Sequence, residues 1–266
     1  MSHDMSHDMS TATAAAATAR PAAARAVLKA EARLFRREPG GLFWITVFPT
    51  LLLVVLGSIP SFRETNASLG GLRLIDAYVP VSVLLAMIMA GLQAMPPVVT
   101  GYRERGILRR MSATPVRPGA LLGAQMGLHG AATLVSAALT LLVGRLAFDV
   151  PLPRQIFGYV LALALAVLVM LALGALVSAL SRTQKIAGAV GSIVVFPMMF
   201  SAGVWLPVQA MPDTLARIVE LLPLGAAAQA LGEATVGDWP SWHQLGVLAL
   251  WTAVLSAAAA RWFRWE

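Results

Sequence analysis

The sequence predicts an all-α integral membrane protein with six transmembrane helices. The prediction rests on the amino-acid composition, on the placement of the basic residues, and on six long apolar runs described below. Of 266 residues, 58% are hydrophobic and only 12% are charged, with a mean hydropathy of +0.74. A soluble domain carries about 25% charged residues, so this chain has too little polar surface to cover one. The charge of +7 comes from basic residues confined to short segments between long apolar runs. That pattern is typical of membrane orientation, and no nucleic-acid partner is expected.

The chain begins with a low-complexity tail, 1–20, which contains a doubled Met-Ser-His-Asp unit. It has no apolar core of the kind that a cleaved signal peptide needs. His3 and His7 could bind a metal weakly, but the pattern favours a disordered tail, and no metal site is expected.

From 21 to 38 the pattern becomes helical and amphipathic. Apolar side chains fall on one side of this helix and basic ones on the others. A basic amphipathic helix of this kind lies in the membrane interface rather than across it. Pro39-Gly40-Gly41 is expected to break it.

Six apolar runs follow, each long enough to cross about 30 Å of hydrocarbon. Their expected bounds are 41–60, 76–100, 119–143, 156–180, 186–205 and 243–260. Pro96-Pro97 should kink the end of the second span. Residues 206–242 hold apolar pieces too short to span and several prolines, which favours re-entrant or interfacial helices.

The distribution of basic residues predicts the orientation. The N-terminal segment, 101–118, 181–185 and the C-terminus together carry 15 Lys and Arg, and the alternate segments carry five. The positive-inside rule therefore places both termini in the cytoplasm. Arginine outnumbers lysine by 18 to 2 and alanine is abundant, which favours a G+C-rich bacterium. The expected location is a bacterial cell (inner or plasma) membrane, crossed several times.

The motifs of intramembrane enzymes are absent. The sequence contains neither Gly-x-Ser-Gly nor His-Glu-x-x-His, and it has no cysteine. A phosphate-binding loop needs a lysine after glycine, but neither Lys29 nor Lys185 follows one. No catalytic residues are expected, and the chain cannot be its own ATPase.

A few polar and small residues lie within the spans. An ionisable group at membrane depth indicates function by default, so His129 is a candidate for a transport path. The amides Gln93 and Gln125 are candidates as well. Interhelical hydrogen bonding explains them more simply. Two pairs of small residues, Gly123 with Gly127 and Gly188 with Gly191, predict close helix packing.

Two segments carry a family resemblance. The first is Tyr102-Arg103-Glu104-Arg105-Gly106, continuing through Arg109-Arg110 to Thr114-Pro115. The second runs from Phe196-Pro197 through Trp205-Leu206-Pro207 and Met211-Pro212 to Leu222-Pro223-Leu224. Together with the six-span order, they resemble the ABC-2 type permeases over residues 21–265. These are the membrane subunits of a class of ATP-driven exporters, and the nearest subgroup is the daunorubicin-resistance-like drug-efflux permeases.

The resemblance implies partners and roles. A separate ABC ATPase subunit would bind ATP and Mg, so this chain needs no cofactor of its own, and a second permease subunit would complete a homodimer in the lipid bilayer. Residues 102–110 would form a cytoplasmic coupling helix, with Ile107, Leu108 and Met111 held against the bundle. The coupling residues implied are Tyr102, Arg103, Glu104, Arg105, Gly106, Arg109, Arg110, Thr114 and Pro115. The alternative for this segment is a positive-inside loop that contacts lipid headgroups.

By the same resemblance, 206–235 would form an extracellular re-entrant helical hairpin. Its gate residues would be Pro207, Met211, Pro212 and Pro223. The apolar spans suit export of a hydrophobic or amphipathic compound, such as a drug or antibiotic. Export of lipid or lipid-linked polysaccharide is the alternative, as is a non-transporting assembly or sensor protein with the same fold.

Overall fold

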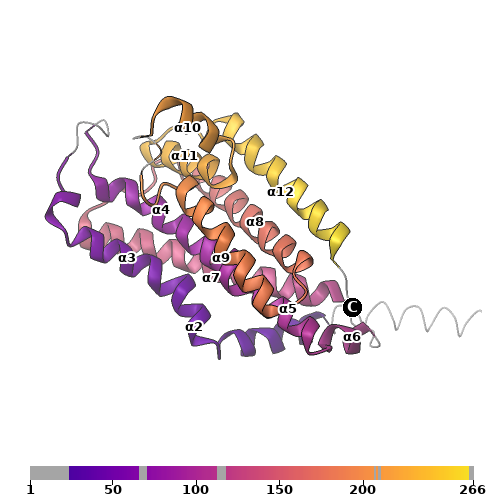
Figure 1. The fold of residues 1–266 in the computed structure, drawn as a ribbon. Helices are drawn as coiled ribbons and strands as arrows, with labels where there is room; N and C mark the ends of the chain where they lie inside the picture. Colours follow the sequence, from indigo (N-terminus) through magenta and orange to yellow (C-terminus); the bar gives the residue numbers. More distant parts are fainter. Residues whose placement is uncertain (1–23, 66–70, 113–117, 207, 209–210, 264–266) are drawn as a thin grey trace, which may run out of the picture.

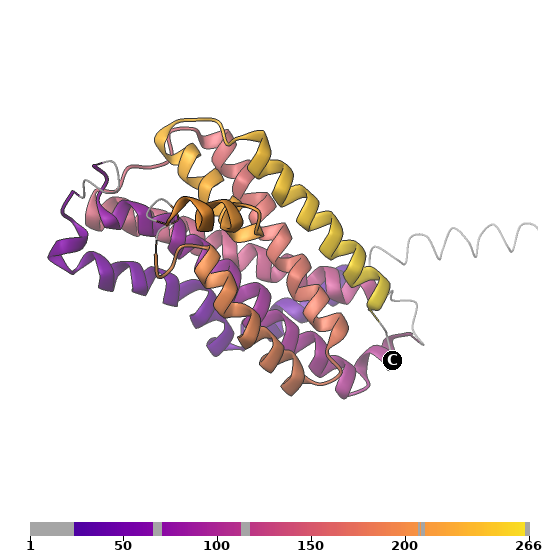
Figure 2. The ribbon, with the colours of Figure 1, turned by 45° about the horizontal axis from the view of Figure 1, so that its top comes forward.

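A computed structural model describes residues 24–65, 71–112, 118–206, 208 and 211–263. Within these residues the secondary structure is helical and no β-strand occurs, apart from an isolated bridge between Thr65 and Arg73. Six of the described helices are long and apolar enough to cross a membrane, and they extend along one another from one end of the molecule to the other (Figures 1 and 2). The all-α, six-span prediction is confirmed. The predicted tail, 1–20, lies outside the described residues.

The first span begins where the sequence predicted a break. A helix over 24–35 ends in a turn, and α2 (Pro39–Leu42) then starts with proline at its first position, where the missing N–H would have no partner anyway. The helix continues through η1 (Phe43–Val47) into α3 (Phe48–Gly57). This span therefore covers Pro39–Gly57, against the expected 41–60.

Two spans contain a π-helical turn shortly before proline. The turn η1 precedes Pro49, and η4 (Met89–Ala94) precedes Pro96 and Pro97. A proline lacks the N–H of the helical ladder, and its ring collides with the carbonyl four residues earlier. A wider turn relieves that conflict. The disturbance expected at Pro96-Pro97 takes this form, and the helix continues beyond the prolines.

The second span lies at the centre of the bundle. It consists of α4 (Leu74–Ile88), η4 and α5 (Met95–Glu104), and 72% of its apolar window is buried, more than in any other span. Glycines allow neighbouring helices to approach η4. A Cβ on Gly174 or Gly191 would overlap the backbone oxygen of Gly91 or Leu92, respectively. The second span is thus fixed at its middle by two close crossings.

The packing predicted from pairs of small residues is correct for only one of the four glycines. Gly191 makes the close crossing described above, but its companion Gly188 meets no described atom within 4 Å of a built Cβ. Gly123 and Gly127 also meet none and lie on the exposed side of their helix. The G-x-x-x-G pattern therefore does not mark a contact within the described part of this chain, because the helix turns that face outward.

The other spans are α7 (Pro118–Phe148), α8 (Ile156–Leu180), α9 (Gln184–Ser201) and α12 (Trp242–Trp262). The helix α7 continues past the expected end at 143, and α9 ends before the expected 205. Side chains cap three starts: Gln155 accepts from the N–H groups of Phe157 and Gly158, Thr183 from Ile186, and Ser241 from Gln244. The helices α8 and α12 pack along each other (Figure 1).

Two shorter helices cover one end of the bundle. They are α10 (Asp213–Glu220) and α11 (Pro223–Val236), and they meet at an angle of 100°. The helix α11 packs against α8, α12 and α4 and is largely buried, whereas α10 lies on the outside (Figure 2). This pair occupies the segment for which re-entrant helices were predicted, and its depth in the membrane stays a prediction.

The outside of the bundle is apolar. Phe157, Leu146 and Ile193 are 81%, 77% and 72% exposed. A soluble monomer rarely exposes large contiguous apolar patches, whereas a bilayer solvates them. This surface fits the multi-pass membrane protein that the sequence predicts.

Candidate functional site

Two ends of the bundle carry the polar chemistry. We call the end formed by helix 24–35, α6 (Ile107–Ser112), the α8–α9 connection and the end of α12 the basic end (Figure 1). The opposite end, formed by α10 and α11, is the hairpin end.

At the basic end, the predicted coupling helix is divided into two parts. The helix α5 runs to Glu104, and the chain then turns at Arg105-Gly106 before α6 begins. Gly106 has φ +65°, a left-handed conformation that glycine adopts without strain. The turn closes with the amide of Gly106 donating to the carbonyl of Arg103 at 2.9 Å. The expected single helix over 102–110 is therefore the end of α5 and the start of a separate short helix.

The apolar side of α6 is held against the bundle. Leu108 is 1% exposed and packs with Tyr102 and Leu121. Val27, from the N-terminal helix, packs on the same cluster, as do Ile107 and Met111. This is the arrangement expected for the apolar residues of the coupling segment. Thr114 and Pro115 lie outside the described residues.

Tyr102 faces the interior rather than a partner. Its hydroxyl donates to Oε2 of Glu31 at 2.7 Å, and the Nε2 of Gln125 donates to the same oxygen at 2.6 Å. All three side chains are buried, at 8%, 7% and 3% exposed. The N-terminal helix, α5 and α7 are thus joined through one carboxylate, which we call the Glu31 joint.

Arg103 points to other elements from the same turn of α5. Its Nη1 donates to the carbonyl oxygens of Ser178 and Ser181, at 3.0 and 2.7 Å. Those carbonyls end α8, where cations are favoured. The guanidinium also lies over the ring of Phe263, 5.1 Å from its centre. Arg103 therefore fastens α5 to the ends of α8 and α12.

The remaining expected coupling residues face outward. Glu104, Arg105, Arg109 and Arg110 are exposed. Arg105 donates from Nε to the carbonyl of Gly101 at 3.2 Å, and Arg110 donates to the carbonyl of Arg105 at 3.2 Å. These bonds keep both arginines close to their own turn. The basic end thus presents a short charged surface, formed by these four residues, on a firmly packed support.

The three expected transport-path residues lie at two places: Gln93 faces α9, whereas Gln125 and His129 lie together on α7. Gln93 lies on η4 and donates to the hydroxyl of Ser192 on α9 at 3.3 Å. Gln125 belongs to the Glu31 joint. His129 follows it by one turn, with Nδ1 2.9 Å from the carbonyl of Gln125 and its ring edge-on to Phe35 at 4.9 Å. Gln93 and Gln125 thus make interhelical hydrogen bonds, as the simpler interpretation expects. His129 instead bonds within its own helix and meets the N-terminal helix through its ring. A role of these residues in a transport path stays a prediction.

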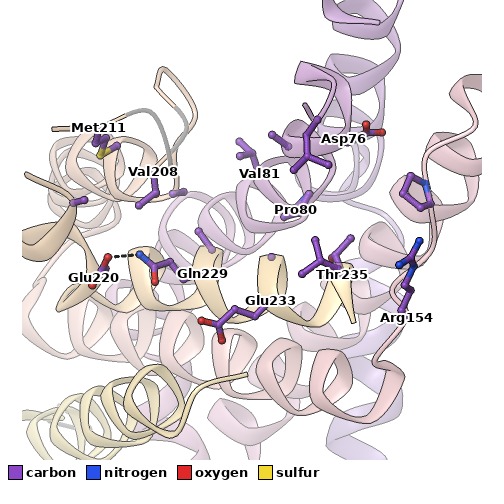
Figure 3. A pocket seen from close by; sticks show the side chains of 18 of the residues that line it. Asp76, Pro80, Val81, Arg154, Val208, Met211, Glu220, Gln229, Glu233 and Thr235 are labelled. Carbon is purple, nitrogen blue, oxygen red and sulfur yellow. Dashed lines mark hydrogen bonds between the residues drawn. The ribbon is translucent and has the colours of Figure 1, made fainter. Parts of the chain in front are cut away.

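The hairpin end contains a pocket of about 690 Å³ between α4, α10 and α11 (Figure 3). Its lining is mainly apolar and includes Pro80, Val81, Val208 and Met211, with Asp213, Glu220 and Arg154 among the charged groups. Of the expected gate residues, Met211 lines this pocket, whereas Pro212 and Pro223 directly precede and begin α10 and α11. Pro207 lies outside the described residues.

Polar side chains hold the hairpin end together. Gln229 donates to Glu220 (Figure 3) and accepts from the Nε2 of Gln244 at 2.9 Å. Glu233 accepts from the amide of Ser241 at 2.7 Å and from Gln244 at 3.4 Å. These bonds join α10 and α11 to the start of α12.

An ion pair stabilises the start of α4, beside the pocket. Arg73 donates to both oxygens of Asp76, at 2.6 and 3.0 Å, and to the carbonyl of Phe148 at 3.0 Å. Its hydrogen bonds to Asp76 raise the pKa of Arg73. The pair caps α4 and ties it to the end of α7. No three His, Asp or Glu side chains in the described part of the chain are grouped to hold a metal ion.

Comparison with known proteins identifies the family. The model of the ABC-2 type transporter family matches residues 22–234 of this chain. The chain belongs to that family. This ABC-2 type protein is also 21% identical, over 221 residues, to a Bacillus subtilis (strain 168) protein named as a transport permease, YvfS. The match covers 82% of this chain and 88% of the relative. The family and the fold make this ABC-2 protein a transporter permease that crosses the membrane several times.

Glu31 was not among the site residues predicted from the sequence of this ABC-2 permease. The signal was present, because Glu31 is the one acidic residue in 24–35 and lies between Val27 and Phe35 on the apolar side. An acid within an apolar stripe predicts a buried polar partner. The sequence also did not predict the hydrogen bonds at the hairpin end, because no local pattern indicates which residues of three separate helices will meet. The residues concerned are Glu220, Gln229, Glu233 and Gln244.

Proposed function

We propose that this chain is the membrane-spanning subunit of an ATP-driven exporter and works with a separate ATPase subunit. The basic end would lie in the cytoplasm, with both chain termini. The observation that carries the proposal is the construction of the basic end: exposed charges on α6 and at the end of α5 stand on side chains anchored in the bundle.

A docking element must be rigid to transmit force. Leu108 and Tyr102 are buried, and Arg103 is hydrogen-bonded to the end of α8, so a push on α6 reaches three spans directly. A loop that merely met lipid headgroups would need none of these contacts. Glu104 supplies the exposed carboxylate that would pair with basic groups of the ATPase subunit.

The packing of α6 and the end of α5 against the bundle suggests how ATP binding would move the spans. ATP binding would draw two ATPase subunits together beneath a permease homodimer, and α6 would carry the movement into α5. The second span is the most deeply buried, so its displacement would reach the pocket at the hairpin end through α4. Cargo would leave past α10 and α11.

The cargo class follows from the surfaces available. The pocket is lined mainly by apolar side chains, with four acidic residues also in its lining, and the spans are almost entirely apolar. A hydrophobic or amphipathic compound, such as a drug or antibiotic, suits these surfaces better than a fully charged solute, because a charge in an apolar site is costly unless it is paired.

Co-purification tests the proposal. The detergent-solubilised chain is isolated with its candidate ATPase, comparing wild type with Glu104→Arg and with Glu64→Arg, a matched reversal at an exposed carboxylate outside the basic end. We expect wild type and Glu64→Arg to retain the ATPase. Glu104→Arg should lose it by about tenfold or more, as for a charge reversal at a docking contact.

If wild type retains no ATPase while its fold is preserved, the exporter proposal is overturned and the six-span bundle remains. If both reversals retain the ATPase equally, Glu104 is not the docking carboxylate.

A further inference from the structure

Glu31 lies midway along the buried side of the N-terminal helix. Val27, one turn before it, packs on the Tyr102 and Leu108 cluster. Phe35, one turn after it, meets the ring of His129. Residues four apart share a helix face, so these three contacts hold the whole length of the described helix against α5, α6 and α7.

The carboxylate is held by neutral donors. Tyr102 and Gln125 converge on a single oxygen, Oε2, and no Lys, Arg or His nitrogen in the described residues forms an ion pair with Glu31. A buried carboxylate without a cation depends on its hydrogen bonds, and bonds to a charged acceptor are short and directional. The Glu31 joint therefore fixes how the N-terminal helix, α5 and α7 are positioned along one another, in addition to holding them in contact.

The joint lies beside the charged surface of the basic end. Tyr102 is adjacent to Arg103 and packs against Leu108 of α6. A displacement of α6 therefore acts on Tyr102, and through Glu31 it acts on the N-terminal helix and on α7. Without the carboxylate, the N-terminal helix would keep only its apolar contacts, which permit sliding.

We propose that Glu31 is the positioning residue that makes α6, the N-terminal helix and α7 move as one unit when the ATPase acts. The inference rests on the proposed function for its driving force, but the joint itself is a property of this chain alone.

Spin-label distances test the joint. The chain has no native cysteine, so Leu28→Cys and Arg110→Cys place one label on the N-terminal helix and one on α6. Distances are measured on the full chain in nanodiscs, alone and with its ATPase trapped by ATP and vanadate. Wild type should give one narrow distribution, the same in both states.

Glu31→Leu should broaden that distribution, and trapping should shift it. ATPase retention should remain near wild type, whereas ATP hydrolysis that depends on the permease should fall about tenfold, within the range of coupling energies between sites. Glu31→Gln keeps an oxygen acceptor for Tyr102 and should restore most of both signals. The control is Glu38→Leu, an exposed carboxylate in the turn beyond the same helix, which should behave as wild type.

Glu31→Leu leaves two buried donors unpaired and could fail to fold. The triple variant Glu31→Leu, Tyr102→Phe, Gln125→Leu removes the donors as well, and replacement of all partners by apolar groups is nearly neutral for stability. It should fold and still show the broad distribution.

A narrow, wild-type distribution in the folded triple variant would overturn the joint. If wild type binds no ATPase, the proposed function fails. The spin-label distances measured without the ATPase then test the joint. A broader distance distribution in the triple variant than in wild type supports it, and equal distributions reject it.

Discussion

At the scale of single residues, neighbouring positions of the Tyr102-Arg103-Glu104 motif have different roles: the first two hold the bundle together and the third is exposed. Tyr102 and Arg103 are adjacent in sequence, yet Tyr102 bonds to Glu31 of the N-terminal helix while Arg103 bonds to the end of α8. Glu104, next in line, is exposed. The helical rotation of about 100° per residue divides the motif in this way. A substitution at Tyr102 or Arg103 should therefore act on the bundle, and one at Glu104 on the docking of a partner.

Gly174 offers a prediction at this scale. A Cβ there would overlap the carbonyl oxygen of Gly91, and two backbones cannot separate without moving whole helices. Gly174→Ala should destabilise the protein by about 1–3 kcal/mol, as overpacking does. The thermal unfolding midpoint in detergent, followed by fluorescence-detected size exclusion, measures the loss.

Gly127→Ala is the control, because a Cβ at Gly127 meets no described atom within 4 Å. It should leave the midpoint unchanged or raise it slightly, since alanine is the better helix former. Equal midpoints for the two variants would contradict the close crossing of α8 and η4.

At the scale of elements, the sequence predicted the spans because each is a long apolar run, and it placed their ends less well. The helix α5 continues to Glu104, since its last turn is supported by Arg103 and Tyr102 rather than by lipid. The π-helical turns were not predicted, although Pro49 and Pro96 were visible. The Glu31 joint joins residues 71 and 94 positions apart, and no local pattern specifies such a pairing.

The polar contacts between α11 and α12 give a prediction at this scale. Glu233 accepts from the amide of Ser241 and from Gln244, which is 6% exposed. Glu233→Ala would remove this carboxylate acceptor from both donors, which should lower the free energy of unfolding by about 1–3 kcal/mol. Hydrogen exchange should quicken at the start of α12 and at the end of α11.

Asp238→Ala is the matched control, because Asp238 is an exposed acid in the same connection. Its exchange rates should equal those of wild type. Unchanged protection in Glu233→Ala would show that apolar packing alone holds α11 against α12.

At the scale of the whole molecule, the fold separates its charges by end. The basic end combines the N-terminal helix, α6 and the α8–α9 connection, all rich in Arg and Lys, whereas 211–242 carries Asp213, Glu220, Glu233 and Asp238 against Arg217. The positive-inside rule acts on segments near the membrane. Since the structure brings the basic segments to one end, they can all lie on one side of a bilayer.

Orientation can be tested with single cysteines, because the natural chain has none and gives no background labelling. Arg182→Cys marks the α8–α9 connection, and Asp238→Cys marks the connection between α11 and α12; both positions are exposed. In right-side-out vesicles, a membrane-impermeant maleimide should label Asp238→Cys at once and Arg182→Cys only after permeabilisation. The reverse pattern would place the basic end outside and separate it from any cytoplasmic ATPase. Labelling of both positions without permeabilisation would instead contradict the six-span arrangement, because one span, α9, lies between the two connections and places them on opposite sides of the membrane.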